Sequence, residues 1–206
     1  MIRRLAVVVL ACATAANAQE LPALYDVYDV GTEDVLNLRA EPKSTSAILG
    51  ALPPDATGVE VVEARDGWGL LNTGERSGWA SMRYLAAASV QPPHGYPARC
   101  FGTEPFWQLR NAADMTLDLA EGAPLRFEPV DRGTALGYSG KFFATARTRG
   151  EAAEAGLSAV ITRAQCNDGM SDRVFGLSVD LLLTSDGVTT LLTGCCTLRS
   201  QPASSH

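Results

Sequence analysis

Four cysteines lie in the second half of the chain, and their thiols could do several kinds of chemistry. They are Cys100, Cys166, Cys195 and Cys196. Such thiols can form disulfides, bind zinc or exchange electrons. Structural zinc sites usually pair cysteines about two to four residues apart, and redox sites usually use Cys-x-x-Cys, whereas the only close pair here is contiguous. The pattern therefore predicts disulfides and neither a metal nor a cofactor.

The pairing of these cysteines can be inferred from strand geometry. Adjacent Cα atoms are only about 3.8 Å apart, which disfavours a bond between Cys195 and Cys196. If this segment is a strand, the two side chains point to opposite faces, and Cys196 shares the apolar face of Leu192. Cys100 precedes an aromatic segment that we expect in the core, whereas Cys166 opens a polar loop. This favours Cys100–Cys196 with Cys166–Cys195, and the exchanged pairing stays open.

Histidine-dependent catalysis has little support in the sequence. The only histidines are His94, in a proline-rich stretch, and His206, the last residue. A catalytic histidine must be held in a packed site, and we expect little order at either position. We therefore predict no Ser-His-Asp or Cys-His hydrolase.

Acidic residues offer a second route to catalysis. Glu104 with Asp168 or Asp172 could act as an acid and base pair. Asn167-Asp168-Gly169 is, however, a turn signal, and Asp172 beside Arg173 is typical of a pair that fixes a loop. The loop also lacks the regular acidic spacing of calcium sites. We predict that the protein is not an enzyme, and the alternative is a wall-active enzyme or enzyme inhibitor that uses these acids.

The N-terminus has the pattern of a secretory signal peptide over residues 1–18: Arg3-Arg4, an uncharged apolar stretch, and Ala16-Asn17-Ala18 before Gln19. Cleavage there would leave a periplasmic or secreted protein, and lipid attachment at Cys12 is the alternative. The apolar stretch is shorter than the roughly 20 residues of a membrane-spanning helix, so no transmembrane segment is expected. Loss of Arg3 and Arg4 takes Lys plus Arg from 17 to 15 against 23 Asp plus Glu, a net charge of −8, which argues against nucleic acid as a partner.

The elements that must position these residues are short strands separated by turn signals. They divide the chain into a first domain at 19–88, a proline-rich linker at 89–98, a second domain at 99–200 and a flexible tail at 201–206. Only residues 151–157 have a helical composition. The expected fold class is all-β.

Residues 36–85 resemble the bacterial Src-homology-3-like (SH3-like) domain. The resemblance rests on Leu36-Asn37-Leu38-Arg39, Ile48-Leu49-Gly50, Val59-Glu60-Val61-Val62, Gly67-Trp68, Gly78-Trp79 and Tyr84-Leu85. It implies a small barrel that docks to peptidoglycan or to an envelope peptide or protein. Trp68, Trp79 and Tyr84 are the candidate ligand residues, and packing of the barrel is the alternative role for each.

The second domain resembles a family of exported bacterial proteins of unassigned function. The resemblance rests on Gly102-Thr103-Glu104-Pro105-Phe106-Trp107, on residues 166–173 and on Gly194-Cys195-Cys196. It implies a disulfide-stapled, lipocalin-like small β-barrel. Candidate ligand residues here are Glu104, Trp107, Asp168, Asp172 and Arg173. Together the two domains predict a non-catalytic envelope binding or adaptor protein.

Overall fold

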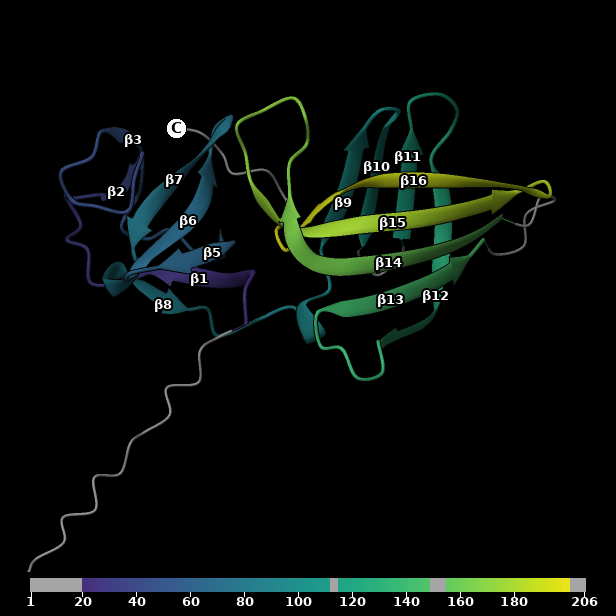
Figure 1. Ribbon diagram of the computed structural model, residues 1–206, viewed down its shortest axis with the longest axis horizontal. Coiled ribbons are helices and arrows are strands. Elements are labelled where there is room, and N and C mark those ends of the chain that lie inside the picture. The colour runs from purple at the N-terminus through teal and green to yellow at the C-terminus, as the bar shows by residue number, and fades with distance from the viewer. Residues whose placement is uncertain (1–19, 112–114, 149–154, 201–206) are drawn as a thin grey trace, which may run out of the picture.

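The protein consists of two β-rich units that lie side by side in the computed structural model (Figure 1). The structure describes residues 20–111, 115–148 and 155–200. The predicted signal peptide with Cys12, the cleavage site before Gln19, and the predicted tail with His206 lie outside these described residues. In the described part, no helix is long and apolar enough to cross a membrane.

The first unit is formed by short strands and a single turn of 3₁₀ helix, Met82–Tyr84. Its strands are β1 (Ala23–Val27), β2 (Leu36–Arg39), β3 (Ile48–Leu52), β4 (Val59–Val61), β5 (Glu63–Arg65), β6 (Trp68–Thr73), β7 (Arg76–Ser81) and β8 (Leu85–Ala87).

These strands form two sheets that enclose a small apolar core. The described residues pair in the orders β4-β1-β8 and β3-β2-β7-β6-β5. Alternation along β2 buries Leu36 and Leu38, and both pack with Val61 and Leu71 in the core. The tight turn before β6 uses Asp66 and Gly67, both with positive φ. The architecture is that of an SH3-like barrel.

The second unit is formed by longer strands, and its residues run from teal to yellow in Figure 1. The strands are β9 (Arg99–Thr103), β10 (Phe106–Asn111), β11 (Met115–Leu119), β12 (Leu125–Thr134), β13 (Lys141–Arg147), β14 (Ala155–Cys166), β15 (Phe175–Ser185) and β16 (Val188–Thr197).

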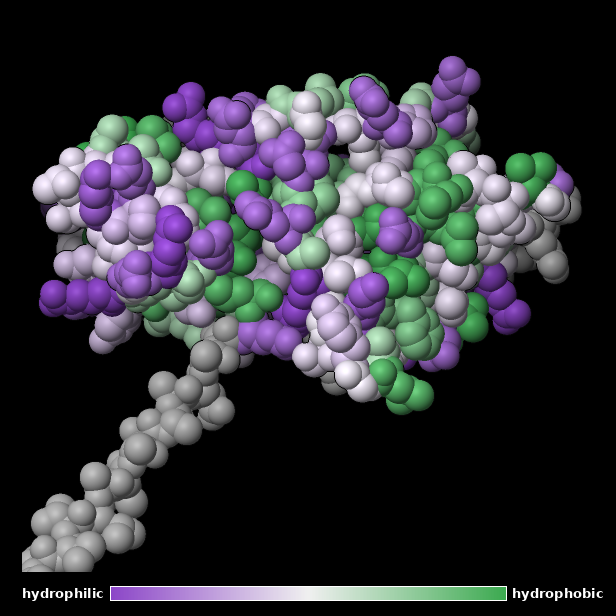
Figure 2. Space-filling view, in the orientation of Figure 1, coloured by the Kyte–Doolittle hydropathy of each residue, from purple (hydrophilic) through white to green (hydrophobic). Residues whose placement is uncertain are grey.

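These eight strands close into an antiparallel barrel, because β9 pairs with both β10 and β16. Closure removes the unpaired sheet edges that would otherwise be open to other chains. The interior is filled by inward residues that alternate with outward ones, as with Leu177, Val179 and Leu181 on β15. The outward face of β13 to β16 carries an apolar patch (Figure 2) that includes Val160, Leu182 and Leu191.

Two disulfides join strand β16 to other parts of the barrel. They link Cys100 to Cys196 and Cys166 to Cys195, which is the connectivity favoured by strand alternation. Cys196 lies in the barrel core, whereas Cys195 faces outward beneath the loop that follows Cys166. All four cysteines of the second unit are thus disulfide-bonded.

Two expectations about local structure are wrong where the structure describes them. Ala155–Leu157, at the end of the segment with helical composition, are the first residues of β14, because register with β15 places Leu157 in the barrel core. The rest of that segment lies outside the described residues. Phe106 points away from the core and is 57% exposed, because strand alternation allows only its neighbour Trp107 to face inward.

The predicted linker is packed against both units, and the backbone at His94 lies in an ordered 3₁₀ turn, Pro93–Gly95. The side-chain oxygen of Gln91 accepts a hydrogen bond from the Leu24 amide at 2.9 Å, and its side-chain nitrogen donates one to the Leu24 carbonyl at 2.6 Å. Tyr96 is buried in the barrel core, and its hydroxyl contacts the carbonyls of Gly133 and Phe143. These contacts overturn the expectation of little order around His94.

Candidate functional site

A groove of about 460 Å³ crosses the first unit. One wall is the loop between β1 and β2, and the other is formed by the start of β6 and the 3₁₀ turn. Trp68 and Tyr84, both half-buried, line it. The predicted ligand residues Trp68 and Tyr84 are therefore brought together at one open site.

Trp79 is separate from this groove. It lies in β7, is 7% exposed, and has the guanidinium carbon of Arg65 at 4.8 Å from its ring centroid. Its burial matches a packing role, although Trp79 lies on the face of β7 opposite to Ala80, which packs in the core of the first unit.

Charged side chains of both signs complete the groove. Asp29 and Asp34 come from the β1–β2 loop, while Arg39 ends β2 and Arg83 lies in the 3₁₀ turn. Arg39 donates to the carbonyl of Ser46 at 2.8 Å, and the Arg83 guanidinium lies 5.5 Å from the Tyr84 ring centroid. None of these four residues is a predicted ligand residue, although Arg39 closes the motif Leu36-Asn37-Leu38-Arg39.

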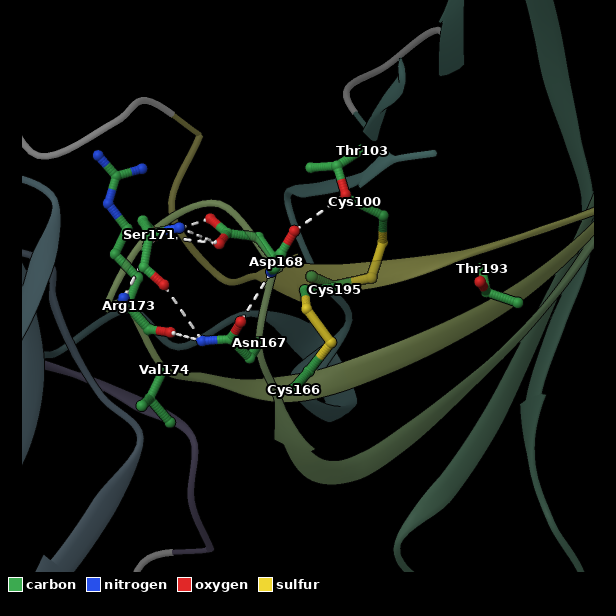
Figure 3. The surroundings of a disulfide bond; sticks show 12 residues. Cys100, Thr103, Cys166, Asn167, Asp168, Ser171, Arg173, Val174, Thr193 and Cys195 are labelled. Carbon is green, nitrogen blue, oxygen red and sulfur yellow. Dashed lines mark hydrogen bonds between the residues drawn. A yellow bond between two sulfur atoms is a disulfide. The ribbon is translucent and has the colours of Figure 1, made fainter. Parts of the chain in front are cut away.

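The loop after Cys166 folds over the Asp168 carboxylate (Figure 3). That carboxylate accepts from the amides of Met170 and Ser171 at 3.0 and 2.9 Å, and from the Ser171 hydroxyl at 3.0 and 2.8 Å. Partial burial raises the pKa of Asp168, but the hydrogen bonds from Met170 and Ser171 outweigh burial, so its pKa lies below the ordinary 3.8. An acid held ionised in this way suits loop fixation rather than proton donation.

Asp172 and Arg173 reach the first unit instead of pairing with each other. The Asp172 carbonyl accepts a hydrogen bond from the amide of Ser77 in β7, and the Asp172 amide donates one to the carbonyl of Glu75 in the β6–β7 turn. Arg173 donates from Nε to the Gly74 carbonyl at 2.6 Å, and its Nη2 lies 2.5 Å from a Glu75 oxygen. The predicted ligand loop thus docks the two units together.

Glu104 and Trp107 occupy different environments although both belong to one motif. Glu104 is exposed on the β9–β10 turn and lines a cleft of about 690 Å³ with Asp168. Trp107 is 4% exposed in the barrel core, with its indole nitrogen donating to the Thr193 carbonyl at 3.2 Å. Trp107 therefore packs the barrel. Among the described residues, no three His, Cys, Asp or Glu side chains gather to hold a metal.

The unit junction also contains polar residues that the sequence analysis missed. Glu60 of β4 is buried against the end of the barrel and accepts from the Leu198 amide at 3.1 Å. Asn72 of β6 pairs through its amide with both backbone groups of Val174, at 2.9 and 3.1 Å. An acid within the otherwise apolar run Val59-Glu60-Val61-Val62 was the available signal for Glu60.

Comparison with known proteins places part of the chain in a family. The profile of the family described as "Bacterial SH3 domain" matches residues 34–86. The first unit thus carries a bacterial SH3 domain, in agreement with its two small sheets. Searches of curated proteins and of solved structures returned no match. The resemblance of the barrel to an exported family stays a prediction.

Proposed function

We propose that this protein is a non-catalytic binding or adaptor protein of the cell envelope, and that its SH3 domain docks to peptidoglycan or to an envelope peptide or protein. The supporting observation is the open groove lined by Trp68 and Tyr84. Half-buried aromatic rings beside charged groups are typical of peptide-binding grooves, because the rings supply contact area at a low cost in conformational entropy.

The charges of the groove favour the peptide part of the wall as the ligand. Stem peptides of peptidoglycan carry carboxylates, and many carry a free amino group. Arg39 and Arg83 suit the carboxylates, while Asp29 and Asp34 suit the amino group. Exposed charges are screened by salt, so binding should weaken as ionic strength rises.

The barrel would then be presented in a fixed orientation. Contacts from the β6–β7 turn, Asn72 and Glu60 join the SH3 domain to the barrel. The disulfides support a location in an oxidising compartment. The hydrogen-bonded state of Asp168 supports the non-catalytic part of the proposal.

Sedimentation of the full chain with purified peptidoglycan sacculi tests this proposal. Trp68→Ala and Tyr84→Ala should each weaken retention by about tenfold, since loss of an aromatic anchor commonly removes about 1–2 kcal/mol. Tyr28→Ala is the matched control, because Tyr28 is 63% exposed and does not line the groove. Equal retention of all variants would refute the groove as the site. Release of muropeptides that depends on Glu104 would refute the absence of catalysis.

A further inference from the structure

A further pocket lies on the outer wall of the barrel, next to the cleft that Glu104 lines. It has a volume of about 410 Å³ and lies between β9–β10 and the loop that follows Cys166. Arg99, Phe101, Phe106, Gln108 and Arg173 are among its lining residues. We call it the Arg99 pocket. It shares no residue with the groove of the SH3 domain.

Arg99 lacks the partners that a partly buried guanidinium normally has. Its Nε is buried, and within the described residues this atom makes no hydrogen bond. The guanidinium carbon lies 5.2 Å from the ring centroid of Phe101, a contact that restricts the side chain without using its N–H groups. Arg173, in contrast, is held by Gly74 and Glu75. The buried Nε is out of reach of a ligand, but the terminal N–H groups of Arg99, which lines the pocket, have no hydrogen-bond partner among the described residues.

The charges around Arg99 favour an anion. Burial lowers the pKa of Arg99. The positive charges of Arg173 and Arg199 lower this pKa further. The negative charge of Glu60 acts in the other direction and raises the pKa of Arg99. Glu60 already accepts hydrogen bonds from Thr197 and Leu198, and burial raises its pKa. Within the described residues, no carboxylate therefore forms an ion pair with Arg99.

The acids that line the pocket are engaged elsewhere. Asp118 pairs with Arg110 at 2.8 Å. Asp168 is occupied by the amides of Met170 and Ser171. Neither supplies Arg99 with a hydrogen-bonded carboxylate.

The apolar part of the pocket specifies the rest of the ligand. The Phe106 ring is 57% exposed at the pocket, and Phe101 is half-buried beside it. An exposed aromatic ring next to a guanidinium suits a molecule that carries an apolar group close to a negative charge. A planar carboxylate can accept hydrogen bonds from both terminal nitrogens of one arginine at once.

We propose that the Arg99 pocket binds a carboxylate attached to an apolar or aromatic group, such as the C-terminal residue of a peptide or a free organic acid. The two terminal nitrogens of Arg99 bind the carboxylate, and Phe106 covers the apolar group. This site is additional to the groove of the SH3 domain and does not depend on it.

Titration of the full chain with N-acetylphenylalanine, followed by NMR of the arginine Nε–Hε signals, tests the proposal. The Arg99 signal should shift in a saturable way, whereas the uncharged N-acetylphenylalaninamide should leave it unchanged. A tripeptide that ends in phenylalanine distinguishes a peptide ligand from a free organic acid. Tighter binding of the tripeptide than of N-acetylphenylalanine assigns the site to a peptide, and equal binding of the two assigns it to a free acid. A shift confined to Arg39 or Arg83, or an equal shift with the amide, would overturn the proposal.

Variants locate the site. Arg99→Gln should weaken binding by about tenfold or more, and Arg99→Lys should weaken it less, because lysine keeps the charge and loses the paired donors. Phe106→Ala should also weaken binding, and since Phe106 is exposed this variant keeps the proposal testable if Arg99 variants misfold. Arg126→Gln, at an exposed residue of β12, should bind as the wild type does. Wild-type affinity of both Arg99→Gln and Phe106→Ala would refute the site.

Discussion

The hydroxyl of Thr197, at the end of the last barrel strand, donates a hydrogen bond to the carboxylate of Glu60 in the SH3 domain. Both residues are buried, and the amide of Leu198 donates to the second carboxylate oxygen at 3.1 Å. A buried carboxyl group is tolerated only if its oxygens accept hydrogen bonds, because burial of an acid without partners is strongly unfavourable. The two units therefore meet through a specific polar contact in addition to apolar packing.

Glu60 should make the stability of the protein depend on pH. Burial raises its pKa above the ordinary 4.5, and the hydrogen bonds and nearby arginines only partly offset this. For an acid whose pKa is higher in the folded state, the stabilising contribution is complete below the unfolded value and is lost as pH rises through the folded value. The free energy of unfolding should therefore decrease as pH rises through that window, as urea titrations at a series of pH values would show.

Glu60→Gln isolates this effect, because glutamine is neutral throughout and keeps an acceptor oxygen. The free energy of unfolding of Glu60→Gln should not show the decrease above pH 4.5 that we expect for the wild type. Glu63→Gln, at an exposed residue of β5, is the control and should retain the wild-type profile. Superimposable profiles for Glu60→Gln and the wild type would show that Glu60 does not titrate in this range.

Asn72 should be important for holding the units together. Its side-chain amide pairs with the Val174 backbone in the manner of a neighbouring strand, and its oxygen also accepts from the Ser77 hydroxyl at 2.6 Å. Asn72→Ala should destabilise the protein by about 1–3 kcal/mol, since it leaves the carbonyl of Val174 without this donor. Faster hydrogen exchange at residues 72–77 and 172–174 is the expected signature, and unchanged exchange there would contradict it.

Asp168 should stabilise its loop, and the effect should depend on ionisation. Asp168→Ala should cost about 1–2 kcal/mol, because it removes the acceptor for Met170 and Ser171 in a partly exposed loop. The pKa of Asp168 is lowered, so its contribution is present above the ordinary 3.8 and is lost as pH falls through the lowered value. Asp180→Ala, at an exposed residue of β15, is the control in urea unfolding at neutral pH. Equal losses would argue against the role of Asp168.

The disulfides should contribute unequally to the barrel. Cys100–Cys196 spans 96 residues and Cys166–Cys195 spans 29, so loss of the first should cost about 1 kcal/mol more by the entropy of loop closure. Paired Cys→Ala variants, compared in urea, measure this difference.

Reduction should affect the barrel more than the SH3 domain, since residues 19–88 contain no cysteine. The indole N–H signal of Trp107 should broaden or shift on reduction, while those of Trp68 and Trp79 stay in place. Equal perturbation of all three indoles would show that the units unfold together.

Much of the fold could be predicted from the sequence because β-strands have a local signature. Alternation with a period of two places Leu117 and Leu119 on one face of β11, and it also assigns Cys195 and Cys196 to opposite faces. The turn signal Asn167-Asp168-Gly169 was equally local, and Gly169 adopts the expected positive φ. Residues 155–157 were misassigned because helical composition is a weak preference that pairing with β15 overrides.

The sequence by itself determined the all-β class, the two-unit organisation and the aromatic candidates, and it favoured one disulfide pairing, since each depends on residue type and spacing along the chain. Only the tertiary structure decided that Trp68 and Tyr84 line a groove, whereas Trp79 and Trp107 are buried. It also decided that Arg173 pairs with Glu75 and that the guanidinium of Arg99 has no hydrogen-bond partner among the described residues. These properties depend on which surfaces meet across long sequence separations, as with Glu60 and Thr197, and no local pattern encodes such a meeting.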